Sequence, residues 1–509
     1  MTWSPETSRG FESRKIKYLI PRYTRGRGLE IGCGQEKAYQ HFIGVDNGHH
    51  FGKGAADIVA QADDLSMFAD ESMDFVFSSH TLEHMEDMGK ALAEWARVIK
   101  PGGHLVLYVP SANLYPKIGE PGANPDHKHD IYCADIATML AEGPYCWIER
   151  EDEERSENDE YSFFSVYEKT KDKGPERLCV PFKPEIKTAL VCRFGGFGDM
   201  LQAALIFPQL KAQGYHVTVM TTPKGMDVIR HDPNVDDFFL LDKDQVPNVE
   251  LQPFWQVQAE RFDRFINLSE SIEGQLLALP GRTNYNWPAA VRRKRMKTNY
   301  HEWTAELAEV PFKPCQLFYP SDVEKEKAHD LLQPSAFSLL WALSGSSLHK
   351  FYPHQDAVIA RILLEMPEAR LYLVGDEACR LLEQGWEAEQ RVVLLSGKIS
   401  IRETLTLAGE VDCVVGPETG VLNAVGMDKS PSKVLLLSHS TANNLSKHWE
   451  NVQSLAPVNT PCHPCHQLHY GQGLCELEEN SHSAICAANI PPYQVYDAIE
   501  KVYKNWRSR

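Results

Sequence analysis

The stretch Arg193-Phe194-Gly195-Gly196-Phe197-Gly198-Asp199 decides the fold of the larger part of this chain. It follows an apolar run, residues 188–192, that predicts a buried strand, and it precedes residues 200–207, which predict the start of a helix. Glycines between a strand and a helix let the backbone turn sharply and approach a ligand closely. Asp199 follows the strand at the sheet edge where ligands bind in open α/β folds. The motif alone leaves two interpretations open for Asp199, a helix N-cap and a catalytic carboxylate.

The pattern Arg-x-Gly-x-x-Gly-Asp before an apolar helix resembles the N-terminal signature of the heptosyltransferases, glycosyltransferase family 9. The resemblance covers about residues 187–500. It implies a GT-B fold, in which two Rossmann-like domains face each other across a cleft. It also gives Asp199 the role of general base on an acceptor hydroxyl.

Later segments resemble the donor site of the same family. Lys350 stands in a Lys-x-aromatic-Pro element that meets the donor diphosphate, and Glu377 ends a predicted strand. Thr419 and Gly420 open a predicted helix, whose free N–H groups suit a phosphate. Glu418 replaces an Asp of the family motif, so the resemblance implies a diphosphate site without specifying ADP-heptose. With these groups in place, the resemblance implies no catalytic metal.

The N-terminal part of the chain carries a second set of motifs. A strand ending in Glu-x-Gly-x-Gly, residues 30–34, is followed by a second strand ending at Asp46, where a carboxylate suits a ribose diol. With the strands predicted around residues 73–79 and 104–110, these motifs resemble the class I S-adenosylmethionine-dependent methyltransferases, over about residues 20–168. The resemblance implies that S-adenosylmethionine binds at Glu30, Gly32, Gly34, Asp46, Gln61, Ala62 and Asp63. Because residues 35–45 are few, we expect the first helix of that fold to be truncated.

Histidines follow the third of these strands. His80 is a candidate general base, since imidazole titrates near neutral pH, or it lines the pocket without taking a proton. His84 is open to the same catalytic interpretation, or it packs under the cofactor. His127 and His129 belong either to an acceptor lid or to a solvated loop.

Cysteines gather near the C-terminus. Cys462, Cys465, Cys475 and Cys486 can supply four thiolates to a structural zinc, or they are free thiols. The basic run at residues 292–297 either attracts a phosphorylated acceptor or forms a solvated helix face.

Length and composition limit the remaining possibilities. The 509 residues suggest about three domains, and no apolar run reaches the roughly 20 residues that span a bilayer. The first residues do not resemble a secretory signal, so a cytoplasmic location is expected. A net charge of −18 makes a nucleic-acid partner unlikely.

The sequence therefore predicts an α/β protein with five parts. They are a methyltransferase domain (1–168), a linker (169–186), an acceptor domain (187–330), a nucleotide-sugar domain (331–492) and a terminal helix (493–509). The predicted function is methylation of a sugar hydroxyl together with inverting glycosyl transfer from a nucleotide sugar, in surface polysaccharide or lipopolysaccharide biosynthesis, on a glycan or lipid-linked acceptor. Two alternatives are phage-type modification of DNA and a domain that binds without catalysis.

Overall fold

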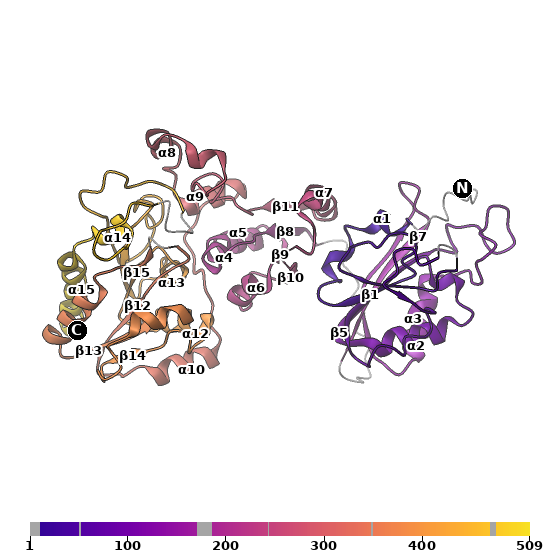
Figure 1. Ribbon diagram of the computed structural model, residues 1–509, viewed down its shortest axis with the longest axis horizontal. Coiled ribbons are helices and arrows are strands. Elements are labelled where there is room, and N and C mark those ends of the chain that lie inside the picture. The colour runs from indigo at the N-terminus through magenta and orange to yellow at the C-terminus, as the bar shows by residue number, and fades with distance from the viewer. Residues whose placement is uncertain are drawn as a thin grey trace. The chain divides into compact units, whose positions relative to one another are not determined.

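A computed structural model describes residues 11–49, 52–170, 186–242, 244–347, 350–468 and 475–508. The chain forms two compact units (Figure 1). Unit 1 combines Met1–Glu185 with Leu240–Arg261, and unit 2 combines Ile186–Phe239 with Phe262–Arg509. Most of the predicted linker, residues 171–185, lies outside the described residues.

Unit 1 contains a seven-stranded sheet in the order β3-β2-β1-β4-β5-β7-β6, in which β7 runs antiparallel to both of its neighbours. The strands are β1 (Gly28–Ile31), β2 (Ile43–Asp46), β3 (Ile58–Val59), β4 (Met73–Ser79), β5 (Ile99–Pro110), β6 (Trp147–Arg155) and β7 (Ser162–Lys169). The parallel strands end at one edge, which therefore collects the glycines and carboxylates predicted to bind the cofactor.

Alternating side chains of this sheet pack into two separate apolar layers, one on each face. Val76, Leu105 and Leu107 pack with helices α2 (Met88–Val98) and α3 (Cys133–Glu142). Phe75, Phe77 and Val106 face the other way, toward α1 (Ser13–Ile16) and η1 (Ile20–Arg22). Helix α2 begins after Asp87, whose side chain caps the helix by accepting a hydrogen bond from the Lys90 N–H.

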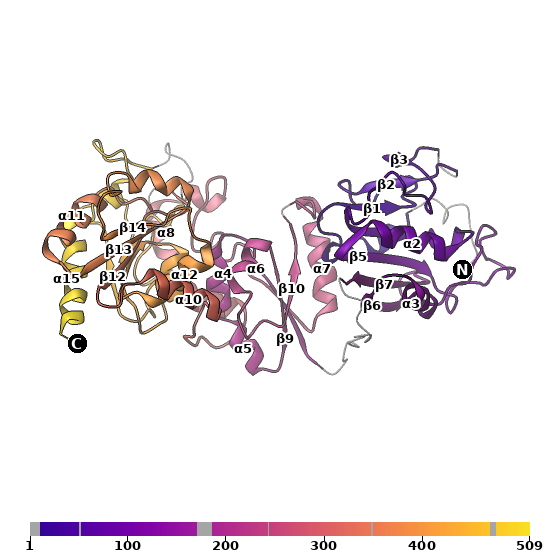
Figure 2. The same ribbon diagram turned by 90° about the horizontal axis from the view of Figure 1, so that it is seen from below.

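Helix α7 (Leu251–Arg261) belongs to unit 1, although the sequence analysis assigns it to the acceptor domain. Val257 packs against the apolar layer of α1, and Figure 2 shows α7 alongside this sheet. The Gln258 amide donates to the Tyr18 carbonyl at 2.7 Å, and the Gln245 amide donates to the Pro21 carbonyl at 2.6 Å. Residues 240–261 are thus an excursion of the chain that completes the α1 face of unit 1.

The charged run Glu149–Glu160 looks like an exposed connection by its composition alone, but the structure differs. Most of it forms strand β6, and the connection is confined to residues 156–161. β6 is the last strand of the sheet, with one edge unpaired, and its side chains alternate between half-buried and exposed positions. Charged residues suit such an edge because they discourage pairing with another chain.

Unit 2 contains two sheets, in the orders β10-β9-β8-β11 and β14-β13-β12-β15-β16-β17; β9, β8 and β11 are parallel in the first, and all six strands are parallel in the second. The first sheet consists of β8 (Thr188–Cys192), β9 (His216–Thr221), β10 (Asp237–Leu240) and β11 (Arg264–Asn267). The second consists of β12 (Phe337–Ala342), β13 (Ala369–Val374), β14 (Val392–Leu394), β15 (Cys413–Pro417), β16 (Ser432–Leu436) and β17 (Val452–Leu455). These sheets, with the sheet of unit 1, confirm the predicted α/β fold class.

The helices of unit 2 cover and join these sheets. They are α4 (Phe197–Ala204), α5 (Phe207–Ala212), α6 (Pro223–Ile229), α8 (Ala289–Arg295), α9 (Tyr300–Leu307), α10 (Asp322–Leu331), α11 (Gln355–Glu365), α12 (Ile401–Glu410), α13 (Gly420–Val425), α14 (Ile485–Ala488) and α15 (Pro492–Arg507). Side chains of α4 and α13 share one apolar cluster with both sheets.

The final helix, α15, is the predicted terminal helix and packs on the second sheet of unit 2. Its buried residues Val495, Ile499 and Val502 pack with Phe337 and Leu339 of the second sheet. Figure 2 shows α15 next to α11. None of the described helices is both long and apolar enough to cross a membrane.

Candidate active sites

In unit 1, the turn after β1 makes a close backbone approach to the loop after β4. Gly32 has a φ of +72°, and a Cβ on it would lie 1.9 Å from Thr81 Oγ1. The Thr81 hydroxyl donates to the Ile31 carbonyl at 3.3 Å. A side chain at position 32 would therefore displace the β4 loop from the cofactor edge of the sheet.

Asp46 and Glu30 hold the glycine turns in place. Asp46 accepts the Gly34 N–H on Oδ2 at 3.0 Å and the Gly48 N–H on Oδ1 at 2.8 Å. The Glu30 carboxylate is buried and accepts the Ala38 N–H at 2.8 Å, and burial raises the pKa of Glu30 to about 8. Residues 32–42, all of them described, contain no helix, as expected from their small number. The turns leave a glycine-lined cradle that fits an adenosyl cofactor.

The residues predicted to contact adenine lie beside this cradle. The Ala60 N–H donates to the Asp46 carbonyl at 3.0 Å, which places the segment after β3 against the end of β2. The Ala62 carbonyl accepts from Trp95 Nε1 at 2.8 Å, and Asp63 pairs with Lys90 at 2.7 Å. Gln61 Oε1 is 3.5 Å from Asn47 Nδ2.

Beyond the cradle, His80 stands next to a buried carboxylate. Its φ is +50°, its Nε2 is hydrogen-bonded to Ser162 Oγ at 2.9 Å, and its Nδ1 lies 3.8 Å from Glu83 Oε1. Burial holds the pKa of His80 well below its ordinary value, so its ring is neutral near pH 7. Sequence reasoning did not single out Glu83. Its position between two histidines in His80-Thr81-Leu82-Glu83-His84 was the available signal.

The other histidines divide between this cluster and the adjoining loop. His84 Nε2 and His127 Nε2 each lie 3.8 Å from Glu83 Oε1. Burial lowers the pKa of His127 to about 4. His129 instead is hydrogen-bonded through Nε2 to the Met85 carbonyl at 2.9 Å.

In unit 2, Asp199 lies in the first turn of α4 and makes the contacts of a capping residue. Its Oδ2 accepts the Gly196 N–H at 2.7 Å, and its Oδ1 lies 3.2 Å from Arg193 Nη2. The same guanidinium donates to Glu273 Oε1 at 2.9 Å and to the Leu268 carbonyl at 2.8 Å. Sequence reasoning missed Glu273, because this ion pair joins residues 80 positions apart. The side chain of Asp199 remains 32% exposed, so an acceptor can reach it.

Asp199 borders a small hollow between the end of β8 and helix α9. Gln202, Ser271 and Thr304 also line it. The Gln202 side-chain oxygen is buried without a hydrogen-bond partner among the described residues. Such an oxygen can accept from a hydroxyl group of a bound molecule.

The two predicted halves of the glycosyl-transfer site meet where α4 touches α13. A Cβ on Gly198 would lie 3.2 Å from the Gly420 Cα, and a Cβ on Gly420 would lie 2.1 Å from the Phe197 ring. Two glycines are therefore required for this helix contact. It places Asp199, one residue after Gly198, on the helix that touches Thr419-Gly420.

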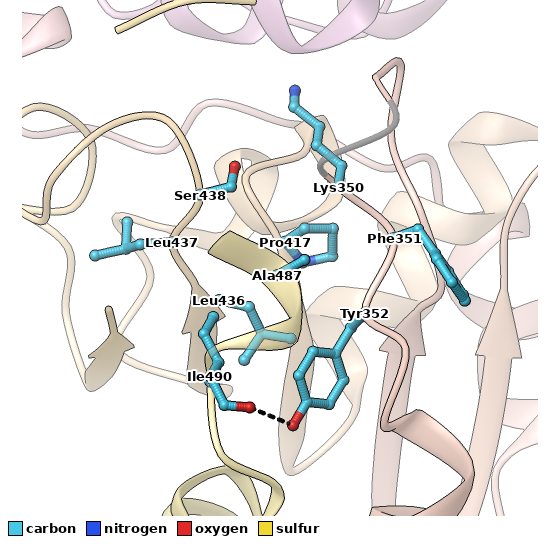
Figure 3. A pocket seen from close by; sticks show the side chains of 9 residues that line it. All are labelled: Lys350, Phe351, Tyr352, Pro417, Leu436, Leu437, Ser438, Ala487 and Ile490. Carbon is cyan, nitrogen blue, oxygen red and sulfur yellow. Dashed lines mark hydrogen bonds between the residues drawn. The ribbon is translucent and has the colours of Figure 1, made fainter. Parts of the chain in front are cut away.

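Lys350 reaches the same region from the second sheet. It lines a hollow with Tyr352, Pro417 and Ser438, and Figure 3 shows its ammonium and the Ser438 hydroxyl pointing to the same side, away from the Tyr352–Ile490 hydrogen bond. Burial lowers the pKa of Lys350, while the charges of Glu418 and Asp199 oppose that shift. The structure thus brings a cation together with both predicted parts of the site.

The other residues predicted to bind the nucleotide-sugar donor differ in burial and in their hydrogen-bond partners. The Glu418 carboxylate is buried and accepts the Ser438 N–H and the Ser440 hydroxyl, each at 2.7 Å. Thr419 Oγ1 is buried and has no hydrogen-bond partner among the described residues. Glu377 lies after β13, is largely exposed, and pairs with Arg380 at 3.2 Å.

The four cysteines act on one another electrostatically, but no three of their sulfur atoms form a group within 4.8 Å that could hold a metal ion among the described residues. Burial raises the pKa of Cys486, and the charges of Cys475, Cys465 and Cys462 raise it further. Arg292, from the predicted basic run, is buried and donates to the Cys465 carbonyl at 2.8 Å, and Arg293 donates to the Pro464 carbonyl at 3.2 Å. Two of the basic residues therefore hold the cysteine loop, Arg292 from a buried position and Arg293 from an exposed one.

Comparison with known proteins separates the two units. Residues 29–107 match the family model of a methyltransferase domain, so the predicted class I resemblance is confirmed there. A curated, uncharacterized protein of Methanocaldococcus jannaschii is 34% identical over 113 residues, which are 21% of this chain. The chain spans about half of that relative, 54% of its length.

Two solved structures represent the similarities in fold. One is an E. coli ADP-heptose lipopolysaccharide heptosyltransferase II, with 14% identity, a TM-score of 0.44, and coverage of 63% of this chain and 99% of that chain. The other is a methyltransferase from Thermotoga maritima described as a possible histamine N-methyltransferase, with 18% identity, a TM-score of 0.27, and coverage of 33% and 95%.

Proposed function

We propose that this chain is a bifunctional transferase that methylates and glycosylates a glycan or lipid-linked acceptor of surface polysaccharide. The methyltransferase half rests on the family match over residues 29–107 and on the cradle at Gly32 and Gly34. S-adenosylmethionine supplies an electrophilic methyl group when bound. Asp46 lies at the end of β2, where it can turn to the ribose diol, and His80 can accept the proton of an acceptor hydroxyl.

The glycosyl-transfer half rests on one observation above all, the contact of α4 with α13 at Gly198 and Gly420. It brings the carboxylate of Asp199 to the start of a helix whose N–H groups suit a diphosphate. Asp199 takes the acceptor proton, while Lys350 and the α13 start stabilise the charge of the departing nucleoside diphosphate. Attack from the face opposite the diphosphate inverts the anomeric carbon.

A second candidate function is that unit 2 binds a nucleotide sugar without transferring the sugar. The observation that favours it is Glu418, whose carboxylate is taken up by the loop at Ser438–Ser440. DNA as acceptor is disfavoured by the net charge of −18.

Calorimetry with S-adenosylmethionine and a panel of nucleotide sugars tests the proposal. We expect both ligands to bind, and Asp46→Ala to weaken S-adenosylmethionine by about 1–3 kcal/mol through lost charged hydrogen bonds. Asp70→Ala, which removes an exposed carboxylate paired with Arg97, is the control. Equal affinities in the two variants would exclude the assigned cofactor site. Binding of a nucleotide sugar without transfer to any glycan would favour the second candidate.

A further inference from the structure

Glu83 is a buried carboxylate without a donor. Its side chain is 1% exposed, and neither Oε1 nor Oε2 has a hydrogen-bond partner among the described residues. Burying an ionised carboxylate without a partner costs far more free energy than burying a neutral polar group. Natural proteins therefore compensate such a carboxylate with a proton, an ion pair or a metal. No lysine or arginine in the described parts of the chain lies within 4.0 Å of its oxygens.

Histidines surround this carboxylate instead. His80 Nδ1, His84 Nε2 and His127 Nε2 each lie 3.8 Å from Glu83 Oε1. These distances are too long for hydrogen bonds. Glu83, His84 and His127 each offer one ligand atom, and these atoms all lie within 4.8 Å of one another. The cluster is therefore spread around a common centre.

A backbone contact fixes the orientation of one imidazole. His84 Nδ1–H donates to the Asp126 carbonyl at 3.0 Å, so its Nε2 carries the lone pair and faces Glu83. The Lys128 N–H donates to the Glu83 carbonyl at 2.9 Å and ties the His127 loop to the segment of Glu83. Histidine ligands of metals are oriented in this way by a hydrogen bond at the second nitrogen.

We propose that Glu83, His84 and His127 form a divalent-cation site in the acceptor pocket of the methyltransferase domain. Ligands at about 2.1 Å from a metal lie about 3.0–3.4 Å from one another, so small side-chain rotations close the observed spacing. Two imidazoles and one carboxylate suit Mn²⁺, Fe²⁺ or Zn²⁺. Three protein ligands leave positions open for oxygen atoms of an acceptor.

The surroundings of the site fit a polyhydroxyl acceptor. The Tyr115 ring lies 5.2 Å from the His127 ring and 4.8 Å from the Tyr161 ring, which together form an aromatic wall. Thr81, two residues before Glu83, touches the Gly32 turn, so the cation site adjoins the cofactor cradle. The acceptor role rests on the proposed methyltransferase function. The proposed cation site lies in the methyltransferase domain, where the sequence predicted no metal.

Titration of the full chain with Mn²⁺, followed by electron paramagnetic resonance, tests the site. We expect one Mn²⁺ per chain, and Glu83→Gln and His127→Asn each to weaken it by about 10-fold or more, since even supporting groups of metal sites have effects of that size. Glu86→Gln is the matched control, because Glu86 is an exposed carboxylate three positions on, paired with Lys128. Zinc held by the four cysteines gives no signal and does not interfere.

Water proton relaxation on the same samples tests the open positions. We expect strong enhancement from exchangeable water on the bound Mn²⁺, and bound Mn²⁺ without exchangeable water would overturn the acceptor role. No stoichiometric Mn²⁺, or equal affinity in Glu83→Gln and the parent, would overturn the site. Calorimetry with S-adenosylmethionine distinguishes the cation-site proposal from the methyl-transfer proposal. Cofactor binding by a variant also shows that the variant is folded. Cofactor binding without Mn²⁺ overturns the cation site alone, and Mn²⁺ binding without cofactor overturns methyl transfer alone.

Discussion

Three buried carboxylates, Glu324 in unit 2 and Glu30 and Glu83 in unit 1, are compensated in different ways. In unit 2, Glu324 is held by Arg402, with Nε–Oε1 at 2.6 Å and Nη2–Oε2 at 2.8 Å. Burial would raise the pKa of Glu324, but the Arg402 guanidinium holds it at about 2. In unit 1, Glu30 and Glu83 form no ion pair with lysine or arginine in the described parts of the chain, and burial raises the pKa of each to about 8. Glu324 is thus neutralised by a guanidinium of its own unit, whereas Glu30 and Glu83 are left to a proton or an external cation.

The largest expected effect concerns Asp199, a carboxylate that is paired yet accessible. Asp199→Asn keeps the hydrogen bond from Gly196 but removes the base, so we expect turnover in glycosyl transfer to fall by roughly 10²–10⁴-fold. Nucleotide-sugar affinity should barely change, because Lys350 and the α13 start carry most of it. Steady-state kinetics with the identified donor measures both effects.

The control for Asp199 is Glu270→Gln, which alters an exposed carboxylate after β11 that pairs with Arg282. Parental turnover in Asp199→Asn would leave Asp199 with its capping role alone. Equal losses in both variants would point to a general charge effect on acceptor binding.

The next effect tests whether a paired charge in unit 2 is structural. Arg402 is fully buried and also donates to the Val228 carbonyl at 2.8 Å, so it joins α12 to α6. Arg402→Met strands the Glu324 carboxylate, which we expect to cost about 3–5 kcal/mol. Hydrogen exchange of peptides from α10 and α12 reports the change in unit 2 specifically.

Arg230→Met is the matched control because Arg230 contacts the same carboxylate. Its Nη2 lies 3.4 Å from Glu324 Oε1, and its side chain is 45% exposed. Solvent screens such a pair, so we expect a cost below about 1 kcal/mol. Similar losses in the two variants would contradict the distinction between buried and exposed partners.

Metal content tests the zinc site predicted from the four cysteines, whose thiolates are a different set of donors from the two imidazoles and one carboxylate of unit 1. Thiolates favour zinc, so metal analysis of protein purified without an affinity-tag metal should give about one zinc per chain. We expect Cys462→Ser to weaken zinc by about 10-fold or more. Cys146→Ser, a half-buried cysteine of unit 1, should retain it. Freely titratable thiols at all four positions, without metal, would contradict the zinc site.

Local sequence patterns predicted which strand ends carry the glycines and carboxylates of the candidate sites in both units. They did not predict which charged residues would pair there. The glycine turns at Gly32 and Gly198 follow from strand, glycine and helix signals within a few residues. The contact of Gln258 with Tyr18 joins positions 240 residues apart, and no local signal in α7 distinguishes unit 1 from unit 2. The partners of Glu418 and the isolation of Glu83 depend on which loop closes over each carboxylate. Candidate residues could therefore be located from the sequence, while their protonation and partners required the fold.

The smallest effect concerns Glu30, whose folded pKa of about 8 lies above the ordinary value of 4.5. Between these values the unfolded chain is ionised at Glu30 while the folded chain keeps the proton, so stability is present at low pH and is lost as pH rises from about 5 to 8. Glu30→Gln retains an oxygen for the Ala38 N–H and does not titrate. Relative to the parent, it should gain on the order of 1–3 kcal/mol in unit 1 between pH 5 and pH 8.

Hydrogen exchange of peptides containing β1 and β2 in the full chain measures this difference, since residues 240–261 belong to the folded unit. Glu86→Gln, at an exposed carboxylate paired with Lys128, should keep the parental pH dependence. Glu83 titrates in both proteins and cancels in the comparison of Glu30→Gln with its parent. A pH slope in Glu30→Gln equal to that of the parent would mean that the carboxylate is ionised in the folded protein. Glu30 would then resemble Glu324 in being ionised, and burial without a cation would no longer distinguish the two carboxylates.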